Sequence, residues 1–122
     1  MPVEQLTALN IEIGEREAQT DDKYFEGLLA PVFVMRRAND PRDIVDRTTW
    51  VEALRKAQKK PRETQITSVS LLGEERAIVT CLVTMDGRRY DNLRVFVKNR
   101  NPASAGQRPW LLLAWVNEPL TT

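Results

Sequence analysis

The sequence predicts an α+β fold in which N-terminal helices pack on a strongly curved, mixed but mainly antiparallel β-sheet that forms a cone with a pocket. Three observations support this prediction. Apolar residues recur every three or four positions early in the chain, as in amphipathic helices. The second half is typical of strands and ends in an apolar segment from Trp110 to Asn117. A pair of turn residues, Asp86 and Gly87, separates two long strand-like segments.

Composition indicates one globular domain spanning residues 1–122. The chain has 122 residues, of which 42% are apolar and 29% charged, and this balance suits a soluble protein with its own core. A net charge of +1 provides no long-range field for nucleic acid or an anionic membrane, so neither partner is expected. The first five residues, Met1-Pro2-Val3-Glu4-Gln5, show no signal-peptide pattern, so a cytoplasmic location is expected.

The residue types that are missing exclude several chemistries. The chain has no histidine and one cysteine, Cys81. An internal disulfide, a cysteine-based zinc site and every mechanism that uses a Ser-His, Cys-His or His-metal arrangement are therefore excluded. We expect no metal and no cofactor, and we expect Cys81 to be an inert packing residue.

Two helices are predicted at the start of the chain. Val3, Leu6, Leu9 and Ile13 share one stripe of the first helix because they are three or four residues apart. Thr20, Asp21 and Asp22 are capping residues for a short second helix, whose inner positions are Tyr24, Phe25, Leu28 and Leu29. Pro31 ends this second helix.

A short strand and a third helix follow. Val32 to Arg36 is predicted as the strand, and Ala38 to Asp46 as an exposed connection because it combines Pro41 with several charges. Thr49 and Glu52 have the spacing of a capping box at the start of the helix. Its inner face is expected to comprise Trp50, Val51, Leu54 and Ala57, with Pro61 as the stop.

Four strands complete the prediction. They are Thr64 to Leu72, Arg76 to Met85, Arg88 to Lys98 and Trp110 to Asn117. A two-residue type I′ turn at Asp86 and Gly87 would place Met85 opposite Arg88, and this pairing sets the register of the whole hairpin.

This register divides the hairpin into two faces. One face is polar at one end and apolar at the other, which favours packing on a helix beside a cavity: it comprises Ile78, Thr80, Leu82, Thr84, Arg89, Asp91, Leu93, Val95 and Val97. The opposite face is expected to meet a second copy of the chain in a homodimer: it comprises Ala77, Val79, Cys81, Val83, Tyr90, Asn92, Arg94 and Phe96. A monomer with a partly apolar outer face is the alternative.

Four segments of the chain carry a resemblance to a known superfamily: Leu28 to Phe33, Thr49 to Leu54, Arg94 to Lys98 and Trp110 to Asn117. Their order resembles the NTF2-like superfamily, a cystatin-like α+β cone shared by ketosteroid isomerase and the SnoaL-like or DUF4440-type group. Within it, the chain is most similar to proteins related to the association domain of calcium/calmodulin-dependent kinase. The resemblance covers nearly the whole chain, with a longer loop, Asn99 to Pro109, before the last strand.

The resemblance implies that the inner face of the last strands lines the cone. It places Leu113, Trp115 and Asn117 inward, on the same wall as Asp91 and Leu93. The expected ligand-binding residues are Tyr24, Trp50, Thr80, Leu82, Leu93, Leu113, Trp115 and Asn117. As an alternative, the two tryptophans in this set anchor the core instead of contacting a ligand.

Asp91 is the candidate catalytic residue. Poor solvation on a largely apolar wall would make Asp91 a better proton acceptor, able to remove a proton next to a carbonyl group. Asn117 and Tyr24 would then donate hydrogen bonds to the resulting oxyanion. In the competing interpretation, Asp91 is a solvated rim charge that pairs with Arg89 or Arg36.

Three functions follow from these patterns. The favoured one is a small cone domain that binds a small hydrophobic or amphipathic molecule and dimerises through its sheet. The alternative is a cofactor-independent isomerase, dehydratase or cyclase of the ketosteroid-isomerase or SnoaL-like type, with Asp91 as general base. A protein-association domain that acts through the sheet face is the third.

Overall fold

The protein is an α+β fold in which three helices pack on one curved sheet. The computed structural model describes residues 1–100 and 108–120. The helices are α1 (Pro2–Ala18), α2 (Asp22–Leu28) and α3 (Arg47–Lys56). The strands are β1 (Leu29–Arg37), β2 (Asp40–Asp46), β3 (Glu63–Leu72), β4 (Arg76–Met85), β5 (Arg88–Lys98) and β6 (Trp110–Pro119). Part of the predicted loop before the last strand, residues 101–107, lies outside the described residues.

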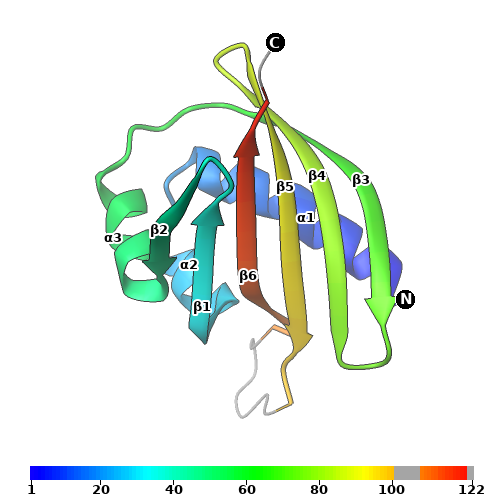
Figure 1. Ribbon diagram of the computed structural model, residues 1–122. Coiled ribbons are helices and arrows are strands. Elements are labelled where there is room, and N and C mark those ends of the chain that lie inside the picture. The colour runs from blue at the N-terminus through cyan, green and yellow to red at the C-terminus, as the bar shows by residue number, and fades with distance from the viewer. Residues whose placement is uncertain (101–107, 121–122) are drawn as a thin grey trace.

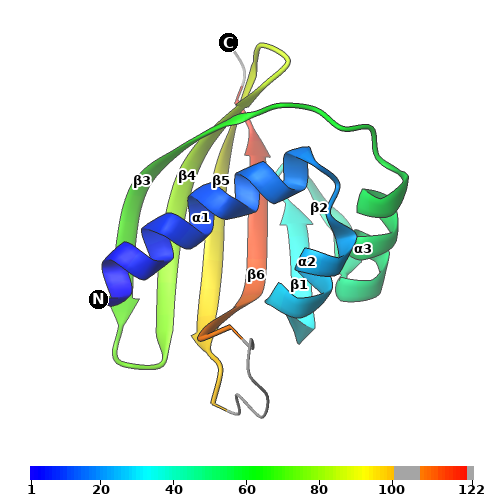
Figure 2. The same ribbon diagram turned by 180° about the vertical axis from the view of Figure 1, so that it is seen from behind.

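The six strands form one sheet in the order β2-β1-β6-β5-β4-β3. Among the described strands only the β1–β6 pairing is parallel, so the predicted mixed, mainly antiparallel sheet is confirmed. All three helices lie on one side of the sheet: α1 crosses behind β3 to β6, whereas α2 and α3 lie behind β1 and β2 (Figures 1 and 2). This arrangement leaves a covered inner face and an outer face without a helix.

The predicted hairpin register is confirmed at every paired position. Met85 pairs with Arg88, and the pairing continues in step to Arg76 and Val97. Asp86 and Gly87 both have positive φ angles, 53° and 73°, as a type I′ turn requires. Glycine adopts this conformation without steric cost, and aspartate is one of the few other residues that tolerates it.

The assignment of the two hairpin faces is wrong. The face expected to form a dimer packs against α1 instead: Ala77, Val79, Cys81 and Phe96 are at most 1% exposed and belong to the core. The face expected to surround the cavity is the outer face, where Leu93 is 38% exposed. Both faces are rich in apolar residues, so alternation alone could not tell which face a helix covers.

Two local predictions also need correction. Ala38 to Asp46 is not an irregular connection, because Asp40–Asp46 forms β2 and pairs antiparallel with β1. The third helix begins earlier than Thr49: Asp46 is its N-cap, and its carboxylate accepts a hydrogen bond from the Thr49 backbone amide. Asp46 therefore does the capping that we assigned to Thr49, which lies within the first turn.

The core lies between the helices and the inner face of the sheet. Leu6 and Ile13 of α1 and Phe25 and Leu28 of α2 are fully buried, as the predicted helical stripes require. Two polar side chains, Asn10 and Arg94, are equally buried in this layer. In the described part of the chain, none of the helices is long and apolar enough to cross a membrane.

Candidate functional site

A hollow lined by both charged and apolar residues lies on the inner face of the sheet, and we call it the cone cavity. Its volume is about 320 Å³. One end of α1, the segment before β3 and strands β1, β4, β5 and β6 all contribute to its walls. The lining residues are Glu17, Met35, Arg37, Arg62, Val83, Met85, Tyr90, Asn92, Trp115 and Asn117.

Each wall follows from local structure. Glu17 lies four residues after the buried Ile13, so helical periodicity turns it toward the sheet. Trp115 and Asn117 are two residues apart on β6 and therefore point to the same face. The extended segment that leads from α3 to β3 carries Arg62 to the end of α1.

A polar network stands behind the cavity wall, centred on Arg94 of β5. Its guanidinium donates to Asn10 Oδ1 (3.0 Å) and to Asn92 Oδ1 (3.1 Å), and it lies 4.4 Å from the Trp115 ring centroid. The Arg94 Nε has no hydrogen-bond partner among the described residues. Burial lowers the pKa of this guanidinium, yet arginine stays protonated in proteins. A full positive charge therefore lies in the core beside the cavity.

The network also fixes the orientation of two side-chain amides. Arg94 and the Trp115 indole are donors only, and both point at the same atom of Asn92, which must be its oxygen. The Asn92 amide nitrogen then donates to Asn117 Oδ1 at 2.8 Å. The NH₂ group of Asn117 is consequently left as a donor at the cavity wall.

Glu17 and Arg62 form the ion pair of the cavity. Arg62 Nη1 lies 3.2 Å from Glu17 Oε1, and the two side chains are only 11% and 19% exposed. Burial raises the pKa of the Glu17 carboxyl above its ordinary value, and the Arg62 and Arg94 charges oppose this shift. The Arg62 Nε has no hydrogen-bond partner among the described residues.

The charges around the cavity do not balance. Arg37 pairs with Asp43 and Arg62 pairs with Glu17, whereas Arg94 bonds two neutral amides. Among the described residues, three guanidinium groups thus share two carboxylates, and Arg94 has no carboxylate within ion-pair distance. The available hydrogen-bonding groups are mostly donors, so the site favours a ligand with acceptor atoms or a negative charge.

Two of the predicted site residues, Trp115 and Asn117, line the cone cavity together. Asp91 does not join them. Asp91 pairs with Leu82 and Glu118 on the outer face, and it is exposed. Adjacent residues of a strand point to opposite faces, so the burial of Asn92 on the inner face turns Asp91 to the outer face.

Thr80 and Leu93 accompany Asp91 on the outer face. The three residues line a depression of about 390 Å³ with Val116 and Glu118. The side chain of Leu82 shares this face, because it lies two residues from Thr80 on β4. The expectation that these residues share a wall with Trp115 is therefore wrong, and the cause is the reversed hairpin face.

The remaining predicted residues occupy other places. Trp50 packs in the core 4.8 Å from the Phe25 ring and 5.5 Å from the Trp115 ring, which is the alternative considered for it. Leu113 lies at a bulge of β6, where the register with β5 shifts, and it is half-buried. Tyr24 is buried on α2 and donates to Glu12 at 2.7 Å, away from the cone cavity.

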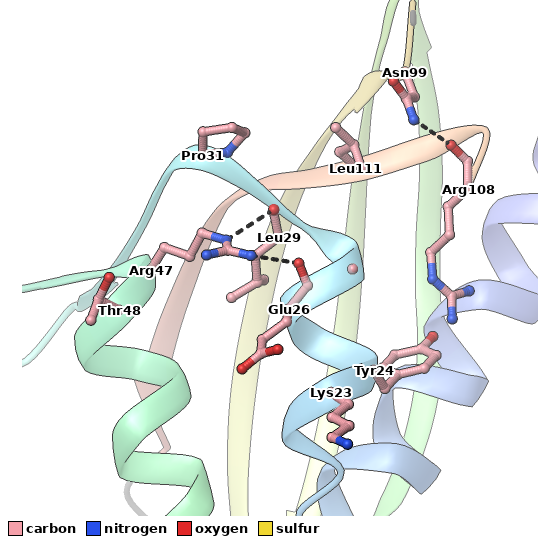
Figure 3. A pocket seen from close by; sticks show the side chains of 11 residues that line it. Lys23, Tyr24, Glu26, Leu29, Pro31, Arg47, Thr48, Asn99, Arg108 and Leu111 are labelled. Atoms are coloured by element: carbon pink, nitrogen blue, oxygen red, sulfur yellow. Dashed lines mark hydrogen bonds between the residues drawn. The ribbon is translucent and has the colours of Figure 1, made fainter. Parts of the chain in front are cut away.

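Tyr24 lines a larger groove of about 680 Å³ between α2, β1 and the start of β6 (Figure 3). Two of its cationic side chains, Arg47 and Arg108, already have partners. Arg47 donates to the backbone carbonyls of Glu26 and Leu29, and Arg108 stacks 4.2 Å from the Tyr24 ring centroid. These contacts hold the helix and strand ends together, so the groove is a weaker candidate than the cone cavity.

Sequence reasoning missed the charged residues of the cavity. Glu17 could have been found, because it continues the stripe of Leu6, Asn10 and Ile13 at helical spacing. Arg94 could not, because a buried arginine and a surface arginine look alike in an alternating strand. Within residues 1–100 and 108–120, no three acidic or cysteine side chains form a group that could hold a metal ion.

Comparisons with known proteins place the chain within a fold. No family model matches the sequence, and no curated protein matches it either. Solved structures do match. An NTF2-like protein of unknown function from Silicibacter pomeroyi DSS-3 is 16% identical, with a TM-score of 0.77 over 97% of this chain and 95% of that one. A cystatin-like fold protein from Burkholderia xenovorans LB400 is 16% identical, with a TM-score of 0.77 over 98% and 92%.

The hub of a calcium/calmodulin-dependent kinase, CaMKII, from S. rosetta is 18% identical, with a TM-score of 0.74 over 94% of each chain. Identities this low show the fold alone, and the NTF2-like, cystatin-like cone expected from the sequence is confirmed. The narrower resemblance to the SnoaL-like or DUF4440-type group stays a prediction.

Proposed function

We propose that the protein binds a small amphipathic molecule with an anionic group in its cone cavity. The observation that carries this proposal is the excess of cations at the cavity: Arg94 is fully buried beside it, hydrogen-bonds two neutral amides, and shares the charge of Glu17 with Arg62. An anion near Arg62 and Asn117 would receive hydrogen bonds and offset that charge. Met35, Val83 and Met85 offer apolar contacts to the remainder of the ligand.

A titration with three probes of equal chain length tests this proposal. Hexanesulfonate should bind, hexanol should bind more weakly, and hexylammonium should not bind, because only the first combines an apolar tail with a negative charge. Isothermal titration calorimetry measures all three. Equal affinity for the three probes, or binding of the cation alone, would contradict an anion site.

We assign the contact with the anionic group of the ligand to Arg62. Replacing Arg62 by Met should weaken hexanesulfonate binding about tenfold or more, because a hydrogen bond to a charged group contributes roughly 1.5–3 kcal/mol. Arg100→Met is the matched control, since Arg100 is 76% exposed and pairs with Glu75. If both variants lost affinity for hexanesulfonate equally, the cause would be the change in net charge, and no specific contact with Arg62 would be needed.

The enzyme alternative has less support. Asp91, its proposed general base, lies on the outer face, and Asn117, its proposed oxyanion donor, lies on the inner face. The sheet separates the two groups, so they cannot act on one substrate. If Asp91→Asn abolished turnover of an identified substrate, the reaction would have to take place in the outer depression.

We also propose a homodimer that forms through the outer face of the sheet. This face has no helix over it, and its apolar side chains are half-exposed: they include Val34, Ile78, Leu82, Leu93, Val95 and Val116. Burying such a surface against a second copy would remove apolar area from water and pair the same patch with itself. The dimer face is thus the reverse of the one expected from the sequence.

Sedimentation velocity at micromolar concentration tests the dimer. The wild-type chain should sediment at twice its monomer mass, and Leu93→Lys should shift it to monomer by placing a charge in the interface. Val3→Lys is the control, because Val3 is 43% exposed on α1, on the other side of the sheet. A monomeric wild type would rule the dimer out.

A further inference from the structure

Among the described residues that line the cone cavity, Glu17 carries the one carboxylate, and it holds the same guanidinium that an incoming anion would use. Its Oε1 is 3.2 Å from Arg62 Nη1. A bound anion that bonds Arg62 therefore comes within a few ångströms of the Glu17 carboxylate. Two negative groups that share one cation in a poorly solvated place cannot both keep their charge without a penalty.

From this geometry we infer that Glu17 takes up a proton when the cone cavity binds an anion, so that anion binding is coupled to pH. This inference rests on the proposed anion site. The proton comes from the solvent and forms the carboxyl O–H bond of Glu17, and no other bond is made or broken. The protonated carboxyl then leaves Arg62 to the ligand and can itself donate a hydrogen bond to it.

The surroundings of Glu17 suit such a change. Every other charged group that lines the cavity is cationic: Arg62 precedes β3 and Arg37 belongs to β1. Arg94 of β5 adds its charge from behind the wall, next to the Cys81 thiol of β4, and Tyr90 of β5 also lines the cavity. Burial already disfavours the ionised form of Glu17 in the free protein, so less is needed to neutralise it.

The sign of the coupling follows from linkage. Because the complex binds one more proton than the free protein, affinity for the anion rises as pH falls and weakens by up to about tenfold for each pH unit on the alkaline side. Replacing Glu17 by Gln removes both the competing charge and the proton. The variant should bind more tightly than wild type at alkaline pH, by about tenfold for each pKa unit of coupling.

The test uses hexanesulfonate, because its headgroup stays ionised and contributes no titration of its own. Calorimetry from about pH 5 to about pH 8, in two buffers that differ in ionisation enthalpy, measures proton uptake by the wild-type protein without any substitution. We expect net proton uptake on binding, up to about one proton per bound sulfonate. Glu17→Gln should abolish the uptake and the pH dependence, and Glu15→Gln, an exposed neighbour on α1, should change neither.

The outcomes separate this inference from the anion site itself. Binding that is independent of pH and of the buffer, and unchanged in Glu17→Gln, would overturn the coupling and leave the anion site intact. If the wild-type protein bound no hexanesulfonate at any pH, the anion site and the coupling would both fail. Retained uptake in Glu17→Gln would assign the proton to another group and also overturn the inference.

Discussion

Asn92 is the residue on which the wall of the cone cavity depends. Its oxygen accepts hydrogen bonds from Arg94 and from the Trp115 indole, and its nitrogen donates to Asn117. The side chain is only 3% exposed, so water cannot replace these partners easily. The Asn92 amide thereby fixes the positions of the Arg94 guanidinium, the Trp115 indole and the Asn117 amide relative to one another.

Replacing Asn92 by Ala should destabilise the fold by about 3 kcal/mol, because two buried donors lose their acceptor and one of them is charged. Asn92→Asp should cost less, since a carboxylate keeps both acceptor contacts and adds a charge opposite Arg94. Urea unfolding measures both variants. Asn39→Ala, in the exposed turn between β1 and β2, is the control. If Asn92→Ala lost no more free energy of unfolding than this control, the proposed role of Asn92 would be wrong.

Glu17 should make stability depend on pH. The folded-state pKa of Glu17 is raised above its ordinary value of 4.5, so the folded protein holds this proton more tightly than the unfolded chain does. The associated stabilisation is present below the ordinary value and is lost as pH rises through the folded-state pKa. Relative to wild type, Glu17→Gln should therefore gain stability as pH rises through this window. If urea unfolding gave the same pH dependence of stability for the wild-type protein and Glu17→Gln, the raised pKa of Glu17 would be contradicted.

Cys81 should be unreactive in the folded protein. Its side chain is 1% exposed on the face that packs against α1, and burial raises the pKa of its thiol. Because it is the only cysteine, labelling with a thiol reagent reports opening of this part of the core. Labelling should become fast only in unfolding concentrations of urea. Fast labelling of the native protein would contradict the burial of this face.

At the scale of elements, the crossing of α1 over the sheet shapes the cavity. Gly14 of α1 lies against Thr64 of β3, and a Cβ atom at residue 14 would collide with the Thr64 hydroxyl. This close approach brings the end of α1 down onto the sheet, where Glu17 meets Arg62. Glycine is needed at residue 14 because any side chain would keep α1 away from β3, and not because of its backbone conformation, which is helical.

Gly14→Ala should therefore destabilise the protein despite the higher helix propensity of alanine. In a Thr64→Ala background the same change should become neutral or favourable by up to about 1 kcal/mol, because the colliding hydroxyl is gone. Gly27→Ala in α2 is the control, since nothing lies within 4 Å of its added Cβ atom. If Gly14→Ala left the free energy of unfolding of the otherwise wild-type protein unchanged, α1 and β3 could move apart without cost.

The sequence predicted most elements because their signals are local. The turn at Asp86 and Gly87 defines the hairpin on its own, and the stripe of α1 depends on spacing within one helix. The strand β2 was missed because its charges and Pro41 are typical of loops, whereas pairing with β1 is a tertiary effect. The N-cap was misplaced because Asp46 and Thr49 are both capping residue types.

All described helices lie on one side of the sheet, and this arrangement decides which face of each strand is buried. Periodicity within strands reports two faces but not which of them the helices cover. The pairs Thr80 with Leu93 and Val79 with Arg94 were predicted correctly, yet their faces were exchanged. The candidate site is therefore not at Asp91 on the outer face. It lies on the inner face, where Asn92 and Arg94 of the sheet approach Glu17 of α1.

If an anion enters the cone cavity, the Trp115 indole should sense its binding. In a titration of ¹⁵N-labelled protein with hexanesulfonate, the indole signal of Trp115 and the side-chain amide signal of Asn117 should shift together and saturate, because both residues line the cavity. The same shifts should be weak in Arg62→Met. Saturating shifts confined to outer-face amides such as those of Asp91 and Leu93, or no shifts, would contradict anion binding in the cone cavity.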